Sequence, residues 1–108
     1  MDKEAEKCSL DLFRKCIPYF EVLADENRQK LVLLLAEGHQ VLNVGDITEK
    51  VSLSRPAVSH HLKILLRAGM VNYTKKGTQN YYFLTIGSMV KVLKDFVTTV
   101  EKTCTKNT

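Results

Sequence analysis

The fold of this chain is decided by Ser54-Arg-Pro-Ala-Val-Ser-His-His-Leu-Lys-Ile-Leu-Leu-Arg-Ala68, which Gly69 follows. Ser54 is a residue type that accepts hydrogen bonds from the first N–H groups of a helix, and Pro56 fits a first turn, where its missing N–H has no role. Four apolar residues then recur at helical spacing: Val58, Leu62, Leu65 and Leu66. The pattern predicts a helix that begins at Ser54, ends at Ala68-Gly69 and buries one face.

A shorter helix precedes this one. Asn43 can cap a helix from Val44 to Lys50, and the turn Val51-Ser-Leu-Ser54 then leads into the longer helix. A short helix, a tight turn and a longer helix form a helix-turn-helix, here over residues 44–68. The first half of the second helix is the part that reaches base edges in a DNA major groove.

A β-hairpin is predicted directly after it, over residues 70–85. Residues 70–75 and 80–85 have the composition of strands, and Lys76-Gly-Thr-Gln79 has that of a turn. The aromatic residues of the second strand, Tyr81, Tyr82 and Phe83, are expected to pack within the hairpin rather than to stack on bases. A basic hairpin beside a recognition helix is a wing, suited to phosphates or to the minor groove.

Three further helices complete a single domain over residues 1–108, mainly α with one small hairpin. The first is predicted from about Lys3 to Ile17, because Pro18 disfavours continuation. The second begins at Asp25 and stops at Gly38. The last covers residues 87–104 and carries two apolar stripes, of which one can cover the domain's own core. The other stripe predicts a second copy of the chain as its partner.

The charge is concentrated in the same region. Residues 50–94 contain eight Lys or Arg and no Asp or Glu, so the other 63 residues sum to −4 in a chain of net charge +4. This distribution indicates a protein that binds a phosphate backbone, here double-stranded DNA. The predicted contacts are Ser54, Arg55, Ser59, His60, Lys63, Arg67, Lys75, Lys76, Thr78 and Gln79. Ser54 could be only a cap, and His61 is expected at the edge of the core.

Other classes are disfavoured. The chain has no apolar run that could span a membrane, no secretory signal, and no grouping of residues that suits catalysis or a cofactor. We therefore expect a cytoplasmic protein that is not an enzyme. One alternative stays open: a winged helix that serves as a protein–protein interaction module, since a fold does not determine a function.

The sequence resembles the ArsR/SmtB family of bacterial repressors over about residues 20 to 100. The resemblance is carried by Leu23-Ala-Asp-Glu-Asn-Arg-Gln-Lys-Leu31, Leu53-Ser-Arg-Pro-Ala-Val-Ser-His-His-Leu-Lys-Ile-Leu65 and Ala68-Gly-Met-Val71. It implies a winged helix-turn-helix homodimer, joined through helices 1–17 and 87–104, that represses transcription from a palindromic operator until an inducer lowers its affinity for DNA. By the same resemblance Ser54, Arg55, Ser59 and His60 contact DNA.

The family's metal-binding residues are missing. Its thiolate motif, Glu-Leu-Cys-Val-Cys-Asp-Leu, is matched by Val41-Leu-Asn-Val-Gly-Asp-Ile47, with Asn43 and Gly45 in place of the cysteines. The zinc-site positions of the last helix match Ile86, Ser88, Thr99 and Lys102, which are poor zinc ligands. We therefore expect no metal at either site.

The three cysteines leave three interpretations open: a thiol switch, packing at an interface, or a metal site of a type other than the family's two. Cys8 and Cys16 lie about 12 Å apart along one helix, too far for a disulfide between them. One of them could meet Cys104, within a chain or across a dimer, as a redox, persulfide or soft-metalloid switch. Alternatively, all three are small residues that fill an interface.

Overall fold

The computed structural model describes residues 2–104, and of residues 103 and 104 it describes the backbone alone. The elements of that part are, in order, α1 (Lys3–Leu23), α2 (Glu26–Ala36), the short 3-10 helix η1 (Glu37–His39), α3 (Val44–Lys50), α4 (Arg55–Arg67), β1 (Val71–Lys76), β2 (Gln79–Leu84) and α5 (Gly87–Cys104). The prediction of a mainly helical chain with one hairpin is confirmed. The predicted bounds of the short helix are also confirmed, because a capping box between Asn43 and Asp46 defines its start.

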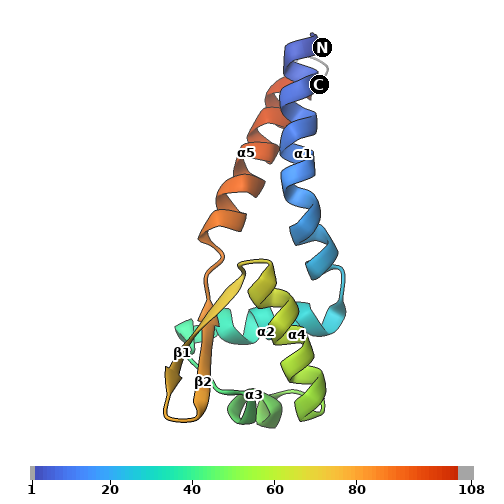
Figure 1. Cartoon of the computed structure of the whole chain (residues 1–108). Helices are drawn as coiled ribbons and strands as arrows, with labels where there is room; N and C mark the ends of the chain where they lie inside the picture. Colours follow the sequence, from blue (N-terminus) through green and yellow to red (C-terminus); the bar gives the residue numbers. More distant parts are fainter. Residues whose placement is uncertain (1, 105–108) are drawn as a thin grey trace.

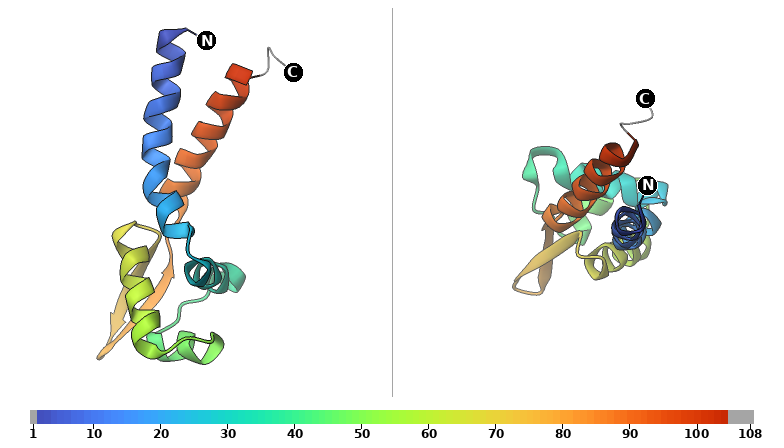
Figure 2. Two further views of the ribbon diagram at one scale, coloured as in Figure 1. Left: turned by 90° about the vertical axis from the view of Figure 1, so that its right-hand side faces the viewer. Right: turned by 90° about the horizontal axis from the view of Figure 1, so that it is seen from above.

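The molecule has two parts (Figure 1). α1 and α5 lie side by side and antiparallel, and together they project away from a body made of α2, α3, α4 and the hairpin. Figure 2 shows the same two helices diverging toward the ends of the chain. The shape is long, 54 × 25 × 23 Å, and the radius of gyration is 17.1 Å. A compact chain of this length would have a radius of about 13 Å. The projecting helices account for the difference.

The predicted end of the first helix was wrong. α1 continues through Pro18 to Leu23. A proline inside a helix removes one backbone hydrogen bond and costs about 3 kcal/mol. Tertiary packing offsets that cost, because Tyr19, Val22 and Leu23 lie against the buried core after the proline. Sequence patterns near Pro18 carry no signal for contacts made with distant residues.

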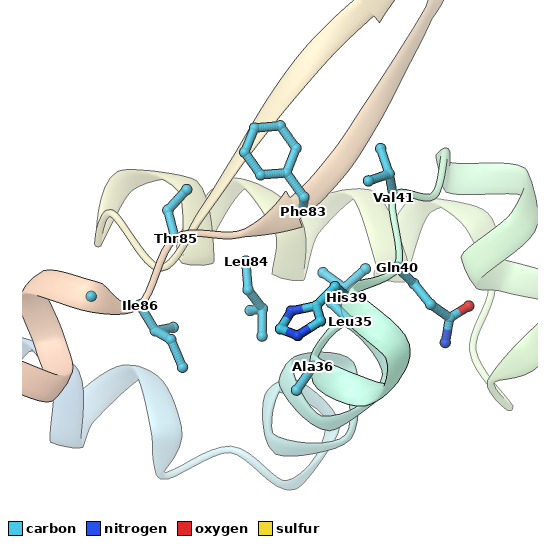
Figure 3. A pocket seen from close by; sticks show the side chains of 10 residues that line it. Leu35, Ala36, His39, Gln40, Val41, Phe83, Leu84, Thr85 and Ile86 are labelled. Atoms are coloured by element: carbon cyan, nitrogen blue, oxygen red, sulfur yellow. The ribbon is translucent and has the colours of Figure 1, made fainter.

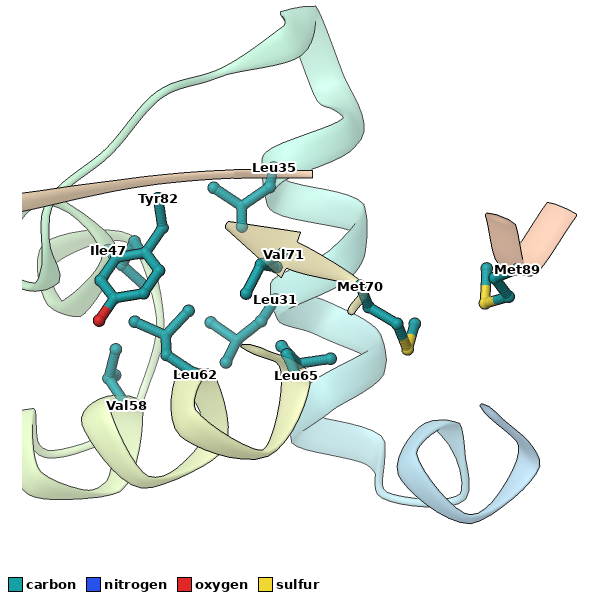
Figure 4. Packing of buried hydrophobic residues seen from close by; sticks show 10 residues of the cluster. All are labelled: Leu31, Leu35, Ile47, Val58, Leu62, Leu65, Met70, Val71, Tyr82 and Met89. Atoms are coloured by element: carbon teal, nitrogen blue, oxygen red, sulfur yellow. The ribbon is translucent and has the colours of Figure 1, made fainter. Parts of the chain in front are cut away.

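The core lies in the body and joins every element there (Figure 4). Its buried side chains come from α2, α3, α4, the two strands and the first turns of α5. Of the four inward positions predicted for the recognition helix, Val58, Leu62 and Leu65 are fully buried, and Leu66 is partly buried against the same core. This face of α4 is held by the core, so its opposite face is available to solvent.

The hairpin has a tighter turn than predicted. Lys76 pairs with Gln79, so both belong to the strands and only two residues form the turn. Gly77 adopts φ +63°, the left-handed conformation that glycine reaches without strain. A bridge ties the hairpin to the body: the N–H of Leu42 donates to the Tyr82 carbonyl at 3.0 Å, and the Tyr82 N–H donates back at 2.7 Å.

The two apolar stripes of α5 are only partly covered. Ile86, Val90 and Leu93 pack against the core. Farther along, Phe96 meets Phe13 of α1 with the ring centroids 4.7 Å apart, while Val97 is 57% exposed. The face of α1 that carries Phe13 has an exposed apolar series, at spacings of three, four and three residues: Leu10, Phe13, Ile17 and Phe20.

Candidate nucleic-acid interface

The start of α4 and the tip of the hairpin lie at the same end of the molecule, opposite the chain termini (Figures 1 and 2). The fold therefore brings two segments that are about 20 residues apart in the sequence to one surface. Nine of the ten predicted DNA contacts are exposed, and the tenth, Ser59, is half-buried. No buried polar or charged residue occurs among the described residues of the core. The polar surface and the packed interior are cleanly separated on α4.

Ser54 and Arg55 both have partners at the start of the recognition helix. The Ser54 hydroxyl oxygen accepts a hydrogen bond from the Ala57 N–H at 3.3 Å, so Ser54 is a helix cap, as one interpretation of the sequence held. The Arg55 guanidinium lies against Gly45 of α3, where an added Cβ would be 2.6 Å from Nη2. The missing side chain at residue 45 therefore makes room for the Arg55 side chain.

His60 and His61 have different environments. His60 is exposed, and His61 is half-buried. The His61 ring nitrogen Nδ1 lies 3.3 Å from an Nη1 atom of Arg28 on α2. Because arginine can only donate, His61 Nδ1 is the acceptor in this contact. The placement of His61 at the edge of the core is confirmed.

Arg28 is a positioning residue that the sequence analysis did not single out. Its Nε donates to the Val22 carbonyl of α1 at 2.6 Å, and Nη1 contacts Asp25 at 3.9 Å as well as His61. One guanidinium thus joins α1, the start of α2 and the recognition helix. The sequence carries no local signal for this role, because the contacts of Arg28 form only in the tertiary structure.

Asp25 caps α2 at the same junction. Its carboxylate accepts hydrogen bonds from the backbone N–H groups of Asn27 and Arg28 at 2.8 and 3.1 Å. The hydrogen bond from the Arg28 N–H is the largest cause that lowers the pKa of Asp25 below its ordinary value of 3.8, and the charge of Arg28 adds to it. The cap is therefore strongest when the carboxyl group is ionised.

The wing presents its cations at the tip. Lys75, Lys76, Thr78 and Gln79 are exposed, and the Lys76 ammonium lies 5.6 Å from the centroid of the Tyr81 ring. A cation over an aromatic face is held by the ring's quadrupole, at a gain of about 0.5–1 kcal/mol at exposed sites. Tyr82 is buried and its ring lies 5.5 Å from that of Tyr73. The predicted packing role is thus confirmed for Tyr82.

The cysteines on α1 differ in their surroundings. Cys8 is exposed and Cys16 is fully buried. Burial raises the pKa of the Cys16 thiol, which disfavours the reactive thiolate. The side chain of Cys104, the third predicted member of a thiol switch, lies outside the described residues.

Among the described residues, no three His, Cys, Asp or Glu side chains come together as metal ligands. In the same part of the chain, no helix is both long and apolar enough to cross a membrane.

The helix-turn-helix, the wing and the exposed polar residues at one end define a winged helix-turn-helix protein of the DNA-binding class. The model of the bacterial regulatory protein, arsR family, matches residues 25–73. The chain is 31% identical to an uncharacterized HTH-type transcriptional regulator of Methanocaldococcus jannaschii over 85 residues, which cover 79% of this chain and 94% of that protein. It is 38% identical to the transcriptional repressor SdpR of Bacillus subtilis over 65 residues, 60% of this chain and 70% of SdpR.

A structural comparison agrees on the fold. The ArsR-like transcriptional regulator from Rhodococcus sp. RHA1 superposes with a TM-score of 0.77 at 20% identity, over 90% of this chain and 87% of that one. The chain belongs to the ArsR family of bacterial regulatory proteins. It is a DNA-binding transcriptional regulator and not an enzyme.

Proposed function

We propose that this chain is a homodimeric, cytoplasmic transcriptional repressor that binds a palindromic operator through α4 and the wing. The observation that carries the proposal is the common placement of the α4 start and the wing tip at the end opposite the terminal helices. Repression, rather than activation, is supported by the likeness to the repressor SdpR. In a twofold dimer, two recognition helices would enter successive major grooves, about 34 Å or a multiple of it apart.

The dimer is supported by the apolar residues that the single chain leaves uncovered. Leu10, Phe13, Ile17 and Phe20 of α1 and Val97 of α5 are each at least 42% exposed. They lie on the two projecting helices, which are also the reason for the large radius of gyration. The spacing on α1 is that of a heptad seam, which packs against a like surface. A second copy of the chain is the occupant that fits, because each protomer presents the same apolar helices.

The residues of the interface have two kinds of role. Three residues in the first half of α4 are proposed to read base edges: Arg55, Ser59 and His60. Ser54 caps the helix at the same end. Lys63 and Arg67 farther along α4, and Lys75, Lys76, Thr78 and Gln79 of the wing, are proposed to contact phosphates and sugars. The Arg55 guanidinium would leave Gly45 to reach a guanine.

The repressor is proposed to work without the family's metal sites. Asn43 uses its side-chain oxygen to cap α3, at 2.7 Å from the Asp46 N–H, and Gly45 has a guanidinium beside it. A neutral amide and a bare backbone next to a cation do not fit a thiophilic metal ion. The positions that match the family's zinc site on the last helix hold residue types that are poor zinc ligands: Ile86, Ser88, Thr99 and Lys102.

A thiol response, where it occurs, is proposed to use Cys8 with Cys104. Phe13 and Phe96 mark one level of the antiparallel pair. A helix rises about 1.5 Å per residue, so positions along the shared helix axis can be counted from these two phenylalanines. Cys8 and Cys104 both lie toward the chain ends and differ by about 4.5 Å along the axis. Cys16 lies on the other side of Phe13 and differs from Cys104 by about 16 Å. A disulfide spans at most about 7 Å between Cα atoms. Because α1 and α5 diverge toward these ends (Figure 2), the Cys8–Cys104 bond is proposed to form across the dimer or with a movement of the two helices toward each other. The buried Cys16 thiol is assigned to packing.

The first test is binding to a generic DNA duplex in a low-salt buffer, followed by selection of preferred sequences from a random library. The proposal predicts measurable generic binding that falls steeply with salt, and a selected site with twofold symmetry. Indifference to duplex DNA at low salt would instead favour the protein–protein interaction module. A selected site without symmetry would contradict the dimeric mode of binding.

A further inference from the structure

An open apolar groove lies where the body, the wing and α5 meet (Figure 3). Its volume is about 510 Å³, within the range of small-molecule sites. Its apolar lining residues include Leu35, Val41, Phe83, Leu84 and Ile86. Val41 is 50% exposed, so the opening reaches solvent. The groove belongs neither to the DNA-binding end nor to the exposed stripe of α1.

His39 lies at the centre of this groove in a strained conformation (Figure 3). Its φ is +52°, and it is the one described residue other than glycine with a positive φ. Such a conformation costs free energy, and strained residues occur often at ligand sites. Gly38 before it is also left-handed, at φ +69°. A second glycine would form this turn without strain, but it would remove the imidazole from the groove.

The imidazole is exposed and, unlike the Gln40 amide nitrogen and the Thr85 hydroxyl, has no hydrogen-bond partner among the described residues. The Gln40 amide nitrogen already donates to the Leu34 carbonyl at 3.1 Å, and the Thr85 hydroxyl donates to the Gly69 carbonyl at 3.0 Å. His39 makes no hydrogen bond with the described residues. Its ring offers at least one N–H donor in either protonation state. No Asp or Glu lines the groove, so nothing there favours a cationic ligand.

We propose that this groove binds a small amphiphilic carboxylate, an aliphatic acid of medium chain length. Its chain would lie along Leu35, Leu84 and Ile86, and its carboxylate would accept a hydrogen bond from the His39 ring. The groove contacts both segments that flank the Leu42–Tyr82 bridge, namely residues 39–41, which lead to the helix-turn-helix, and residues 83–87, which lead from the wing to α5. A ligand there would bias the orientation of the DNA-binding end relative to the terminal helices.

The carboxylate would be an effector of the proposed repressor. Only its effect on DNA binding rests on the proposed function; its binding to the groove does not. The test therefore measures binding without DNA. Octanoate, and octanol as its uncharged counterpart, are titrated into the full chain while methyl resonances are followed by NMR. The expected result is a saturable shift at Leu35, Val41, Leu84 and Ile86, with Leu10 and Ile17 of α1 unchanged. Shifts confined to α1, or none that saturate below micelle formation, overturn the proposal.

Two variants separate the roles of the wall and the imidazole. Ala36→Phe fills the groove and is expected to abolish binding of both ligands, whereas Leu33→Phe adds the same ring to an exposed site of α2 outside the groove and leaves binding unchanged. If Ala36→Phe does not fold, Val41→Ala takes its place. It shortens the apolar wall at an exposed position and should weaken the binding of both ligands. His39→Gln should weaken octanoate binding by roughly tenfold, equivalent to one charge-assisted hydrogen bond, with less than about a twofold effect on octanol.

Equal losses for the two ligands in His39→Gln would show a merely structural role for the imidazole and would overturn the carboxylate assignment. Groove resonances that shift with protein concentration in the absence of ligand would assign the groove to a second copy of the chain instead. A variant that loses octanoate binding but keeps normal DNA affinity confirms that the two functions are separate. Failure of DNA binding with intact octanoate binding contradicts the proposed function and leaves the ligand site standing.

Discussion

Phe13 of α1 and Phe96 of α5 meet edge to face, with their ring centroids 4.7 Å apart and their planes at 72°. This contact fixes the level at which the two terminal helices face each other. Phe13 also lies edge to face with Phe20, at 6.5 Å, and still leaves 47% of its surface exposed. The same aromatic side chain thus contributes to packing within the chain and to the uncovered apolar surface.

Dimerisation should depend on the uncovered face of α1. Ile17→Glu places a charge in the exposed apolar series without removing the Phe13–Phe96 contact. Burying an unpaired carboxylate in an interface is strongly unfavourable, so we expect this variant to be monomeric at micromolar concentration. Sedimentation velocity measures the change. Leu33→Glu, at an exposed leucine of α2, is the matched control and should stay dimeric; a wild-type monomer in dilute solution would contradict the proposed assembly.

Lys76 of the wing should contribute affinity without selectivity. Lys76→Ala removes a phosphate contact, so binding should weaken to a similar extent on every DNA sequence. The slope of log affinity against log salt concentration should fall by about one for each phosphate contact that is lost. Fluorescence anisotropy at several salt concentrations measures both effects. An unchanged salt slope would show that Lys76 does not contact a phosphate.

Arg55 should behave differently because it lies at the start of the recognition helix. Arg55→Ala is expected to cost about 1–3 kcal/mol on the preferred operator and much less on random DNA, since a bidentate contact to guanine is lost only on the former. The measurement compares anisotropy titrations on the two duplexes. Equal losses on both would refute the base-reading role.

Gly45→Ala, which crowds the Arg55 guanidinium, is expected to fold normally because the crowding atom is the end of a flexible side chain.

The cap at Asp25 should make stability depend on pH. Asp25→Ala removes the acceptor for two backbone N–H groups and should therefore lower the free energy of unfolding. Because the pKa of Asp25 in the folded protein is below its ordinary value of 3.8, the stability due to its charge is fully present above that value and is lost as the pH falls through the lower pKa of the folded state. Urea unfolding between pH 2 and pH 7 measures the effect.

The control for this experiment is Asp25→Asn, which keeps a side-chain oxygen as the cap and removes only the charge. The difference in stability between wild type and Asp25→Asn should therefore be present at pH 7 and shrink at acid pH. A difference that does not vary with pH would assign the whole effect of Asp25 to the neutral hydrogen bonds.

The cysteines should respond unequally to oxidants. We expect diamide to lower the DNA affinity of wild type and of Cys16→Ser, but not of Cys8→Ser or Cys104→Ser, because Cys8 is exposed and Cys16 is buried with a raised pKa. Anisotropy with and without diamide measures this, and zinc is expected to have no effect. A response in none of the proteins would remove the thiol switch and leave the cysteines with packing roles alone.

Local sequence signals determined most of the regular structure. Asn43 and Ser54 begin α3 and α4 at the predicted residues, and the apolar spacing of α4 predicted which of its residues are buried. Caps and helical periodicity act between residues three or four positions apart, so a sequence displays them directly. The same locality made the wing and its basic tip predictable.

Contacts between distant residues decided the rest. α1 passes through Pro18 because residues beyond it pack on the core, and Arg28 positions the recognition helix because His61, 33 residues away, comes within 3.3 Å. The groove around His39 exists only where the end of α2 meets the end of β2. Such features depend on the path of the backbone through space, and the free energy that selects them comes from burial and hydrogen bonding between segments that no local pattern links.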